Sequence, residues 1–472
     1  MPASTCGSTL SLSPPPSPAP HARRGAHAPT RPSPRPPVLA ACESYPRWLR
    51  RCVEAVLKGF AIGSGLKGGL ALFSALLRLR GLVSRRARIS SAAAATNAAE
   101  AALVGAVKET VRYGLFLGAF AGTYVSMDEC IAAVWGRERT ARWRSLFAGL
   151  IAGPAMLFAG LQTTHTSLAT YILVRAGVLA ARCGMKSERF GKICQRLAWS
   201  HGDIFMMCVS SAQIASAYIL NRDSFPPSYK AFLGRQIGKE PVVLQGLKEL
   251  VNNNAFTNLA GIEEYYRTVG VDLKLDPKMK IPCSQVSIDG HFFSFLLQAY
   301  GRAFPVYVPV YLIPAFVVHR THLIKRPLSA IGKNLLGIAR SSLFLSVYCA
   351  SEWGWTCLLF RTFQRCNIPL LVLGTFPTGL ALLIEKKSRR IEISLYCLAR
   401  ALESFCTRMA DAGLLPSVLQ IQRADVIVFS IATSIIMHCY AQEREVFRSK
   451  YLNVLDCVFG VPIPSTDENK QN

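Results

Sequence analysis

Hydrophobic residues lie in long, nearly uninterrupted blocks along this chain, and polar residues fill the segments between them. Such blocks are typical of helices that cross a bilayer, because lipid requires every backbone N–H and C=O group to be paired within the segment. The blocks form two groups of five. They lie near 53–77, 111–127, 146–161, 166–181 and 203–221, then near 292–318, 335–350, 366–384, 393–407 and 425–441. Several are shorter than the roughly 20 residues that a perpendicular span needs, so we expect four to five membrane segments in each group.

The segments between and beyond these groups predict how the chain is divided. Residues 1–42 are rich in Pro, Ser and Arg and predict a disordered tail, with an organelle transit peptide as the alternative. Residues 53–221 and 291–460 predict two helical membrane repeats. Residues 222–290 predict a polar linker with two short amphipathic helices, and 461–472 a second disordered tail. The sequence therefore predicts an all-α integral membrane protein made of two helical bundles.

The two groups of blocks repeat each other in sequence. At one constant offset, Asp203, Tyr218, Arg222, Phe225, Tyr229 and Leu233 align with Asp425, Tyr440, Arg444, Phe447, Tyr451 and Leu455. In the preceding block, Tyr171, Leu173, Arg175 and Ala176 align with Tyr396, Leu398, Arg400 and Ala401. This register indicates an internal duplication of the kind seen in transport folds, although a duplicated bundle also serves a purely architectural role.

The number of spans in each repeat decides the predicted topology. Five spans, which the length of both first blocks favours, would invert one repeat relative to the other and place Asp203 and Asp425 on opposite sides of the membrane. Four spans would make the repeats parallel and place both aspartates on one side. The distribution of basic residues does not decide the orientation, because they flank the blocks on both sides.

The net charge of +26 points to an anionic partner, either nucleic acid or a membrane surface. Arginine and lysine gather at the ends of apolar blocks, which favours membrane lipids and gives no reason to expect a nucleic-acid partner. The block of Lys386, Lys387, Arg389 and Arg390 marks a membrane-facing loop. It is also a candidate contact for anionic lipid head groups.

Glycines spaced by four are the strongest packing signal. Gly114, Gly118 and Gly122 share one helix face, and Gly149 and Gly153 share another. Missing side chains let a second backbone approach closely, so we interpret these residues as helix-packing positions. A pore-lining or subunit contact, as in a homo-oligomer, is the alternative.

Four charged residues are candidates for transport or lipid contacts. Lys67 and Arg302 lie in or beside the first block of each repeat, where glycines or prolines interrupt the apolar pattern. Interrupted segments at matching places are a sequence indicator of a transport site. Asp203 and Asp425 open the last blocks, either as helix N-caps or as intramembrane acids that couple ions.

The sequence offers no pattern for catalysis, a cofactor or a metal. The 15 cysteines are scattered without a CxxC pair, which is typical of small packing residues in a reducing compartment. His319 and His322 lie three apart but lack a carboxylate partner, and no nucleotide-binding loop is present. We therefore predict a protein that is not an enzyme and carries no cofactor.

Several runs resemble the transmembrane protein 135 family. LIEKKSRR at 383–390 resembles the basic signature of that family, and YVPVYLI at 307–313 resembles the run near its cysteine-rich segment, whose end corresponds to Pro282 and Cys283. FLGAFAGTYVS, AGLIAGPAMLF and the stretch 203–232 resemble the other repeat of the family. Together these runs cover most of residues 55–460, with the halves in the opposite order from animal members.

This resemblance implies a multi-spanning protein of peroxisomes, mitochondria and lipid droplets, without known catalytic residues, that acts in lipid homeostasis and organelle dynamics. We therefore expect a peroxisomal or mitochondrial membrane, with a plastid membrane as the alternative. The repeat is also similar to the four-helix unit of the mitochondrial inner-membrane translocase channel family. The alternatives are a transporter or channel for a lipid, metabolite or polypeptide, with its site between inverted repeats, and a membrane-bound lipid enzyme. A polar cavity between the halves would favour transport, and a filled interface would favour a scaffold.

Overall fold

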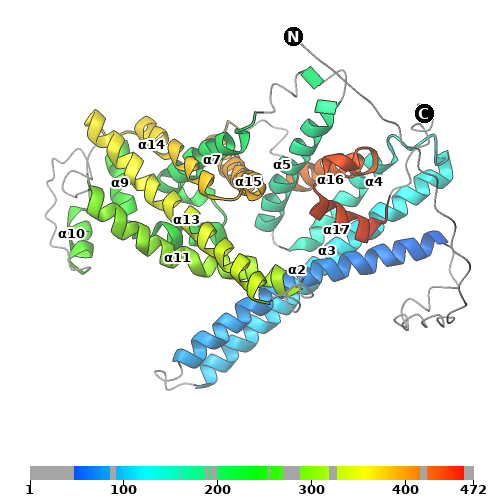
Figure 1. Cartoon of the computed structure of the whole chain (residues 1–472), viewed down its shortest axis with the longest axis horizontal. Helices are drawn as coiled ribbons and strands as arrows, with labels where there is room; N and C mark the ends of the chain where they lie inside the picture. Colours follow the sequence, from blue (N-terminus) through cyan, green and yellow to red (C-terminus); the bar gives the residue numbers. More distant parts are fainter. Residues whose placement is uncertain are drawn as a thin grey trace, which may run out of the picture. The chain divides into compact units, whose positions relative to one another are not determined.

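The computed structural model describes residues 47–85, 92–160, 162–186, 191–192, 199–253, 256–268, 288–317, 327–414 and 423–461. The predicted tail 1–42, most of the tail 461–472, and Cys283, His319 and His322 lie outside these residues. Every regular element in the described chain is a helix (Figure 1). This confirms the prediction of an all-α protein.

The helices follow one order twice. The first repeat comprises α2 (Arg47–Arg85), α3 (Ala92–Trp135), α4 (Arg144–Ala152), the 3₁₀ helix η1 (Gly153–Ala159), α5 (Gln162–Lys186), α7 (Gly202–Leu220), η2 (Arg222–Ser224) and α8 (Pro227–Ile237). The second comprises α11 (Ile288–Val317), α13 (Pro327–Phe363), α14 (Ile368–Thr375), η3 (Phe376–Ile384), α15 (Lys387–Asp411), α16 (Ala424–Gln442), η5 (Arg444–Val446) and α17 (Ser449–Phe459). The match includes α8 and α17, so the first repeat extends beyond the boundary at residue 221 that the sequence suggested.

Two further helices, α9 (Pro241–Asn253) and α10 (Leu259–Thr268), lie between the repeats where short amphipathic helices were expected. Leu244, Leu247 and Leu250 of α9 are buried in a core that also contains Tyr218 of α7 and Phe360 of α13. Helix α9 is therefore packed through its apolar face onto the helices around it.

Four helices of the described chain are long and apolar enough to cross a membrane: His165–Lys186, Gly202–Leu220, Leu328–Phe363 and Ala424–Gln442. Two shorter apolar segments, at 144–159 and 368–384, are each an α-helix continued by a 3₁₀ helix. This set fits an integral membrane protein, but it gives two long apolar helices per repeat where the apolar blocks predicted four to five. The inverted topology stays a prediction.

Helix α15 explains part of that difference, because its apolar block near 393–407 is amphipathic. The helix begins with the basic run Lys387, Arg389 and Arg390 and carries Arg400 and Glu403 near its middle. Its matching helix in the first repeat, α5, is one of the four candidate spans. The two repeats thus share an order of helices while differing in polarity.

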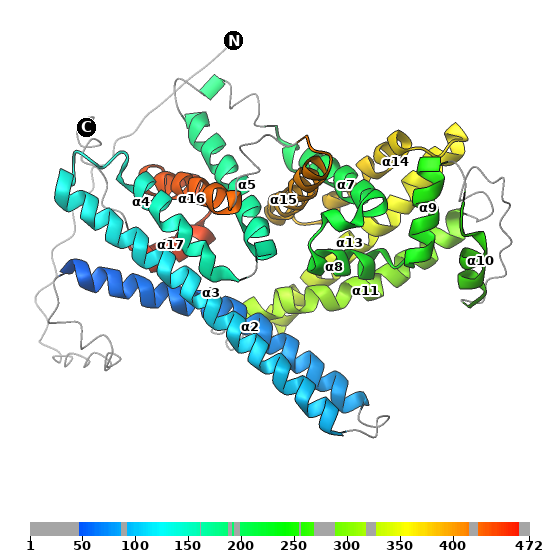
Figure 2. The same ribbon diagram turned by 180° about the vertical axis from the view of Figure 1, so that it is seen from behind.

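The last helix of each repeat packs in the bundle of the other repeat. Helix α16 lies along α4, η1 and α5, whereas α7 lies along α14, η3 and α15 (Figures 1 and 2). The short helices that follow take the same direction, since α17 contacts α2 and α3, and α8 contacts α11. Each bundle therefore combines the first helices of one repeat with the last helix of the other.

Glycines make room for the exchanged helices at matching positions. At Gly153, a Cβ atom would lie 2.5 Å from the Cα of Ser430 in α16. At Gly379 of η3, a Cβ atom would lie 2.6 Å from the Cα of Cys208 in α7. Cys208 and Ser430 align at the constant offset of the repeat. The two exchange contacts are thus two copies of one close backbone approach.

The remaining predicted glycines also lie at helix–helix contacts. A Cβ atom on Gly118 would come within 3.1 Å of the Val56 carbonyl oxygen in α2, and Gly114 and Gly122 face the same helix. Gly149 faces Ser434 in α16, where a Cβ atom would lie 2.9 Å from its Cα. Gly114, Gly118 and Gly122 thus lie between α3 and α2. Gly149, like Gly153, contacts the exchanged helix α16.

We expect Gly153→Leu to destabilise the protein by about 1–3 kcal/mol, because a larger side chain would force α16 away from η1. Gly177→Leu in α5 is the control, since nothing lies within 4 Å of a Cβ atom there. Thermal unfolding of the purified chain in detergent measures both variants. Equal losses in the two variants would contradict the close contact at Gly153.

The exchange itself predicts a cross-link between the repeats. Cys183 of α5 and Cys439 of α16 are free thiols with their sulfur atoms 3.3 Å apart. We expect mild oxidation to join them in a variant whose other cysteines are serine. After cleavage at a protease site inserted between α10 and α11, the two halves should migrate together on a non-reducing gel and separate after reduction. Separation without reduction would show that α16 does not lie against α5.

Candidate functional site

The two bundles meet where the matching helices α5 and α15 lie against each other. Val174, Leu395 and Ala399 form a buried apolar cluster at this junction. Beside it, Tyr171 packs edge-on against Tyr396, with ring centroids 6.5 Å apart. These two tyrosines align in the repeat, so the junction brings a residue together with its own copy.

An arginine site lies on one side of this tyrosine pair. The Arg175 guanidinium lies over the rings of Tyr171 and Tyr451, 5.0 and 4.6 Å from their centroids. It donates hydrogen bonds to both hydroxyls, at 2.8 and 2.9 Å, and forms an ion pair with Glu392 of α15. Glu392 also binds Arg448, at 3.1 Å. Arg175 thus joins α5 to α15 and to the exchanged helix α17.

The matching site on the other side is built around Arg400. Its guanidinium lies 5.5 Å from the ring centroid of Tyr396 and 5.8 Å from that of Tyr229, which α8 supplies. It donates a hydrogen bond of 2.8 Å to the Ser167 hydroxyl and forms an ion pair of 2.7 Å with Glu403. Ser167 aligns with Glu392. Arg400 is therefore paired with a carboxylate of its own helix, whereas Arg175 is paired with a carboxylate of the opposite helix.

Carboxylates of the protein itself neutralise both arginines, and the Arg400 site is also buried. The side chains of Arg400 and Glu403 are only 10% and 6% exposed, and burial raises the pKa of Glu403. A buried ion pair of this kind costs desolvation energy but becomes hard to break, because removing one partner leaves an uncompensated charge. Each site also needs a tyrosine from an exchanged tail. The sites therefore hold the exchange in place.

The structure brings together a pair that the sequence did not suggest. His165, at the start of the candidate span in α5, lies with its Nδ1 atom 3.7 Å from the Asp425 carboxylate in α16. Their side chains are 4% and 7% exposed. The two residues are far apart in sequence and meet only because α16 packs in the first bundle. A lone histidine in an apolar block carries no sign of such a partner.

Neither Asp203 nor Asp425 caps its helix, which corrects that reading of both. The N-cap residues are His201 for α7 and Arg423 for α16, and neither provides a side-chain cap. Arg423 adopts a left-handed conformation, with φ of 65°. Asp203 accepts a hydrogen bond of 2.9 Å from the backbone N–H of Ile204. The matched aspartates therefore have different surroundings.

Lys67 and Arg302 each contact groups within their own bundle. The Lys67 ammonium lies 5.1 Å from the ring centroid of Tyr113. Arg302 donates a hydrogen bond of 3.3 Å to the Gln236 carbonyl at the end of α8, and its guanidinium lies 5.2 Å from the Phe295 ring centroid. Each cation therefore packs locally, and neither is directed toward the junction of α5 and α15.

The basic block splits into an exposed pair and a bound pair. Lys386 and Lys387 are exposed. Arg389 lies 3.4 Å from the fully buried carboxylate of Glu385, while Arg390 donates hydrogen bonds of 3.0 and 2.8 Å to the carbonyls of Glu385 and Leu383. The arginines thus fix the turn from η3 into α15, and only the lysines are presented for a head group.

The described residues contain no group of three or more His, Cys, Asp or Glu side chains that could hold a metal ion. Cys357 takes part in a disulfide bond, whereas the other cysteines whose surroundings are described are free thiols. Comparison of the chain with protein families, curated proteins and solved structures finds no match.

The junction predicts a specific pattern of stability. We expect Arg400→Met to cost about 3–5 kcal/mol, because it leaves the buried Glu403 carboxylate without its cation. The double variant Arg400→Met, Glu403→Leu should recover most of that loss, since it removes both charges together. Thermal unfolding in detergent measures the two variants against the unmodified chain. A double variant no more stable than the single one would show that the pair is not closed as described.

Proposed function

We propose that this chain is a non-enzymatic multi-pass protein of an organelle membrane, peroxisomal or mitochondrial, that acts in lipid homeostasis and organelle dynamics. The observation that carries the proposal is the filled junction between the bundles. Tyr171 packs on Tyr396, and the carboxylates of the chain itself neutralise Arg175 and Arg400. A scaffold needs such contacts to fix its shape, whereas a substrate path between the halves would need polar groups directed into open space.

The location and the lipid role rest on the resemblance to the transmembrane protein 135 family. The four long apolar helices support the membrane location in general. The exposed side chains of Lys386 and Lys387, at the start of α15, support contact with an anionic membrane surface. Membrane lipids are therefore the partners that we propose, together with anionic head groups at this basic turn.

A C-terminal fluorescent fusion of the full chain tests the location. We expect it to coincide with peroxisomal or mitochondrial markers and not with plastid markers. Deletion of the gene should change the amount of stored neutral lipid and the size or number of the organelles, and the unmodified chain should restore both. A fusion found at the plasma membrane, or unchanged lipids and organelles after deletion, would contradict the proposal.

The buried pair of His165 and Asp425 favours a second candidate, a transporter. Ionisable residues within apolar helices are costly and commonly mark ion pathways, and this pair lies in two of the candidate spans. A transporter or channel that uses the pair would conduct protons through it.

Proteoliposomes that contain a pH-sensitive dye separate the two candidates. We expect a scaffold to leave an imposed pH gradient as stable as in empty liposomes. A gradient that collapses with the unmodified chain but persists with Asp425→Asn would favour the transporter. Asp203→Asn is the matched control, because Asp203 aligns with Asp425 but lies in different surroundings.

A further inference from the structure

The end of the last helix carries the same arginine and tyrosine in both repeats. In the second repeat, Arg444 donates hydrogen bonds of 2.8 and 2.7 Å to the two carboxylate oxygens of Asp456 in α17. The Tyr440 hydroxyl donates to the same carboxylate, at 2.8 Å. The carboxylate is thus bound by a planar guanidinium and a phenol at once, a strong arrangement for an anionic group.

The first repeat keeps the cation and the phenol but lacks the carboxylate. Arg222 donates a hydrogen bond of 2.8 Å to the Tyr218 hydroxyl, and its guanidinium lies 4.8 Å from that ring centroid. The residue that aligns with Asp456 is Gly234 of α8. A Cβ atom on Gly234 would lie 3.1 Å from the Tyr218 hydroxyl. The position that Asp456 fills in one repeat is therefore open in the other, directly beside the same phenol.

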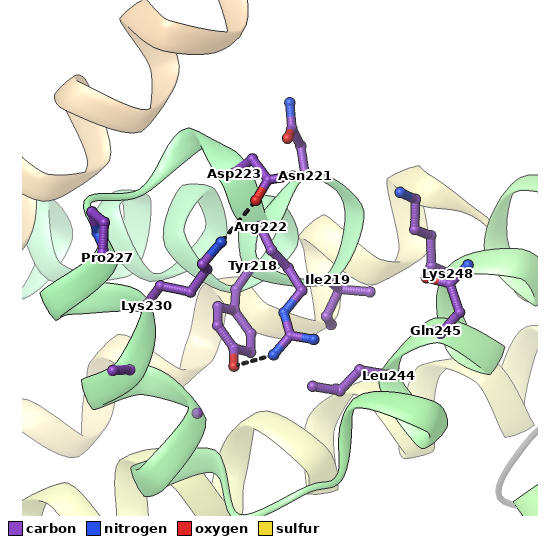
Figure 3. Close-up of a pocket in the computed structure, with 12 residues that line it drawn as sticks. Tyr218, Ile219, Asn221, Arg222, Asp223, Pro227, Lys230, Leu244, Gln245 and Lys248 are labelled. Atoms are coloured by element: carbon purple, nitrogen blue, oxygen red, sulfur yellow. Dashed lines mark hydrogen bonds and ion pairs between the residues drawn. The ribbon is translucent and has the colours of Figure 1, made fainter.

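A cavity of about 620 Å³ occupies this place, and Figure 3 shows Arg222 among its lining residues together with Tyr218 and Leu244. Gly234 is also part of the lining. The Arg222 Nε atom is buried and has no hydrogen-bond partner within the described chain. In the second repeat the Nη2 atom of the corresponding guanidinium binds Asp456. The cavity thus contains a guanidinium that no carboxylate of the described chain hydrogen-bonds, unlike its counterpart in the second repeat.

The charges around the cavity favour an anion. Arg222, Lys230 and Lys248 line it, against the single carboxylate of Asp223. Asp223 lies 2.7 Å from the Lys230 ammonium, and this contact lowers the pKa of the carboxyl group. The lining therefore carries a positive surplus. The cavity lies at the end of the candidate span in α7, since Leu220 immediately precedes Asn221 and Arg222 of the lining.

We propose that this cavity binds a phosphate-bearing ligand whose anionic group takes the place that the Asp456 carboxylate fills in the other repeat. The Arg222 guanidinium provides planar, paired donors, the Tyr218 hydroxyl lies beside it, and Lys230 and Lys248 add charge. A phospholipid head group and a soluble phosphate ester share this chemistry. The inference goes beyond the proposed function and stands without it, because it rests on the aligned residues and the cavity.

The test uses the full chain in detergent micelles. Dioleoyl phosphatidic acid, dioleoyl phosphatidylcholine and inorganic phosphate are added separately, and binding is followed by the rise in the thermal midpoint. We expect Arg222→Gln to weaken phosphate binding about tenfold or more, since a charge-assisted hydrogen bond is lost. Gly234→Asp should abolish binding by supplying the carboxylate internally and should raise the midpoint without ligand. Gly234→Asn, of the same size but uncharged, fills the same space, so it should also weaken binding but should raise the midpoint without ligand less than Gly234→Asp does.

Each outcome has a defined meaning. A response to phosphatidic acid alone identifies a lipid head group, whereas a response to inorganic phosphate as well identifies a soluble phosphate ester; both support the site. No response to either phosphate probe overturns it, and so does binding by Gly234→Asp that equals binding by the unmodified chain. Lys248→Gln provides a check if the Arg222 variant fails to fold, because unchanged binding there also contradicts the proposal. The organelle location and the lipid phenotype are measured separately, so either inference can fail alone.

Discussion

The close approach of the last helix of each repeat to the 3₁₀ helix of the other is the contact on which the rest of the structure depends. At Gly153 and Gly379 the exchanged helix lies so near that even a methyl group would collide with its backbone. Each of these 3₁₀ helices has a proline in its first turn, where proline fits because that N–H group lacks a helical partner in any case. Glycine and proline together thus shape a narrow apolar surface that accepts α16 in one bundle and α7 in the other.

Once that approach is made, the polar contacts at the junction follow from chain connectivity. Helix α17 follows α16 and helix α8 follows α7, so Tyr451 reaches Arg175 and Tyr229 reaches Arg400. Neither arginine could keep both aromatic partners if the last helices returned to their own repeats. The close backbone contacts at the glycines require the exchanged arrangement, and so do the contacts of the two arginines. Because both favour the same arrangement, the chain specifies one fold.

The sequence predicted the helices and their duplication, but it did not predict which helices pack against each other. Continuous apolar blocks predicted the helices, and the alignment of Asp203 through Leu233 with Asp425 through Leu455 predicted the duplication. The duplication also explains why the exchange of α7 and α16 could not be predicted. Their sequence patterns are alike, so each helix would fit either bundle. The pairing of His165 with Asp425 depends on the exchange and could not be anticipated. The inward turn of Arg389 depends on the buried Glu385, and a basic run alone gives no sign of it.

The positions at which the two repeats differ are the places where one repeat can take on a function that the other lacks. At the junction, Glu392 and Ser167 occupy matched places, and the arginine that loses its carboxylate across the helix pair gains Glu403 from its own helix. Near the ends of α7 and α16, Asp456 and Gly234 occupy matched places, and no carboxylate of the described chain hydrogen-bonds the Arg222 guanidinium.

The two sites therefore differ in kind. At the junction, a carboxylate from the same helix replaces the one that is missing across the helix pair. Rocking one bundle against the other would still separate Arg175 from Glu392, and Arg400 from the Ser167 hydroxyl. In the pocket beside α8, no other carboxylate of the described residues replaces the one that is absent at Gly234. A change in ligand occupancy is therefore easier to accommodate at that edge, where it leaves the interface between the bundles intact.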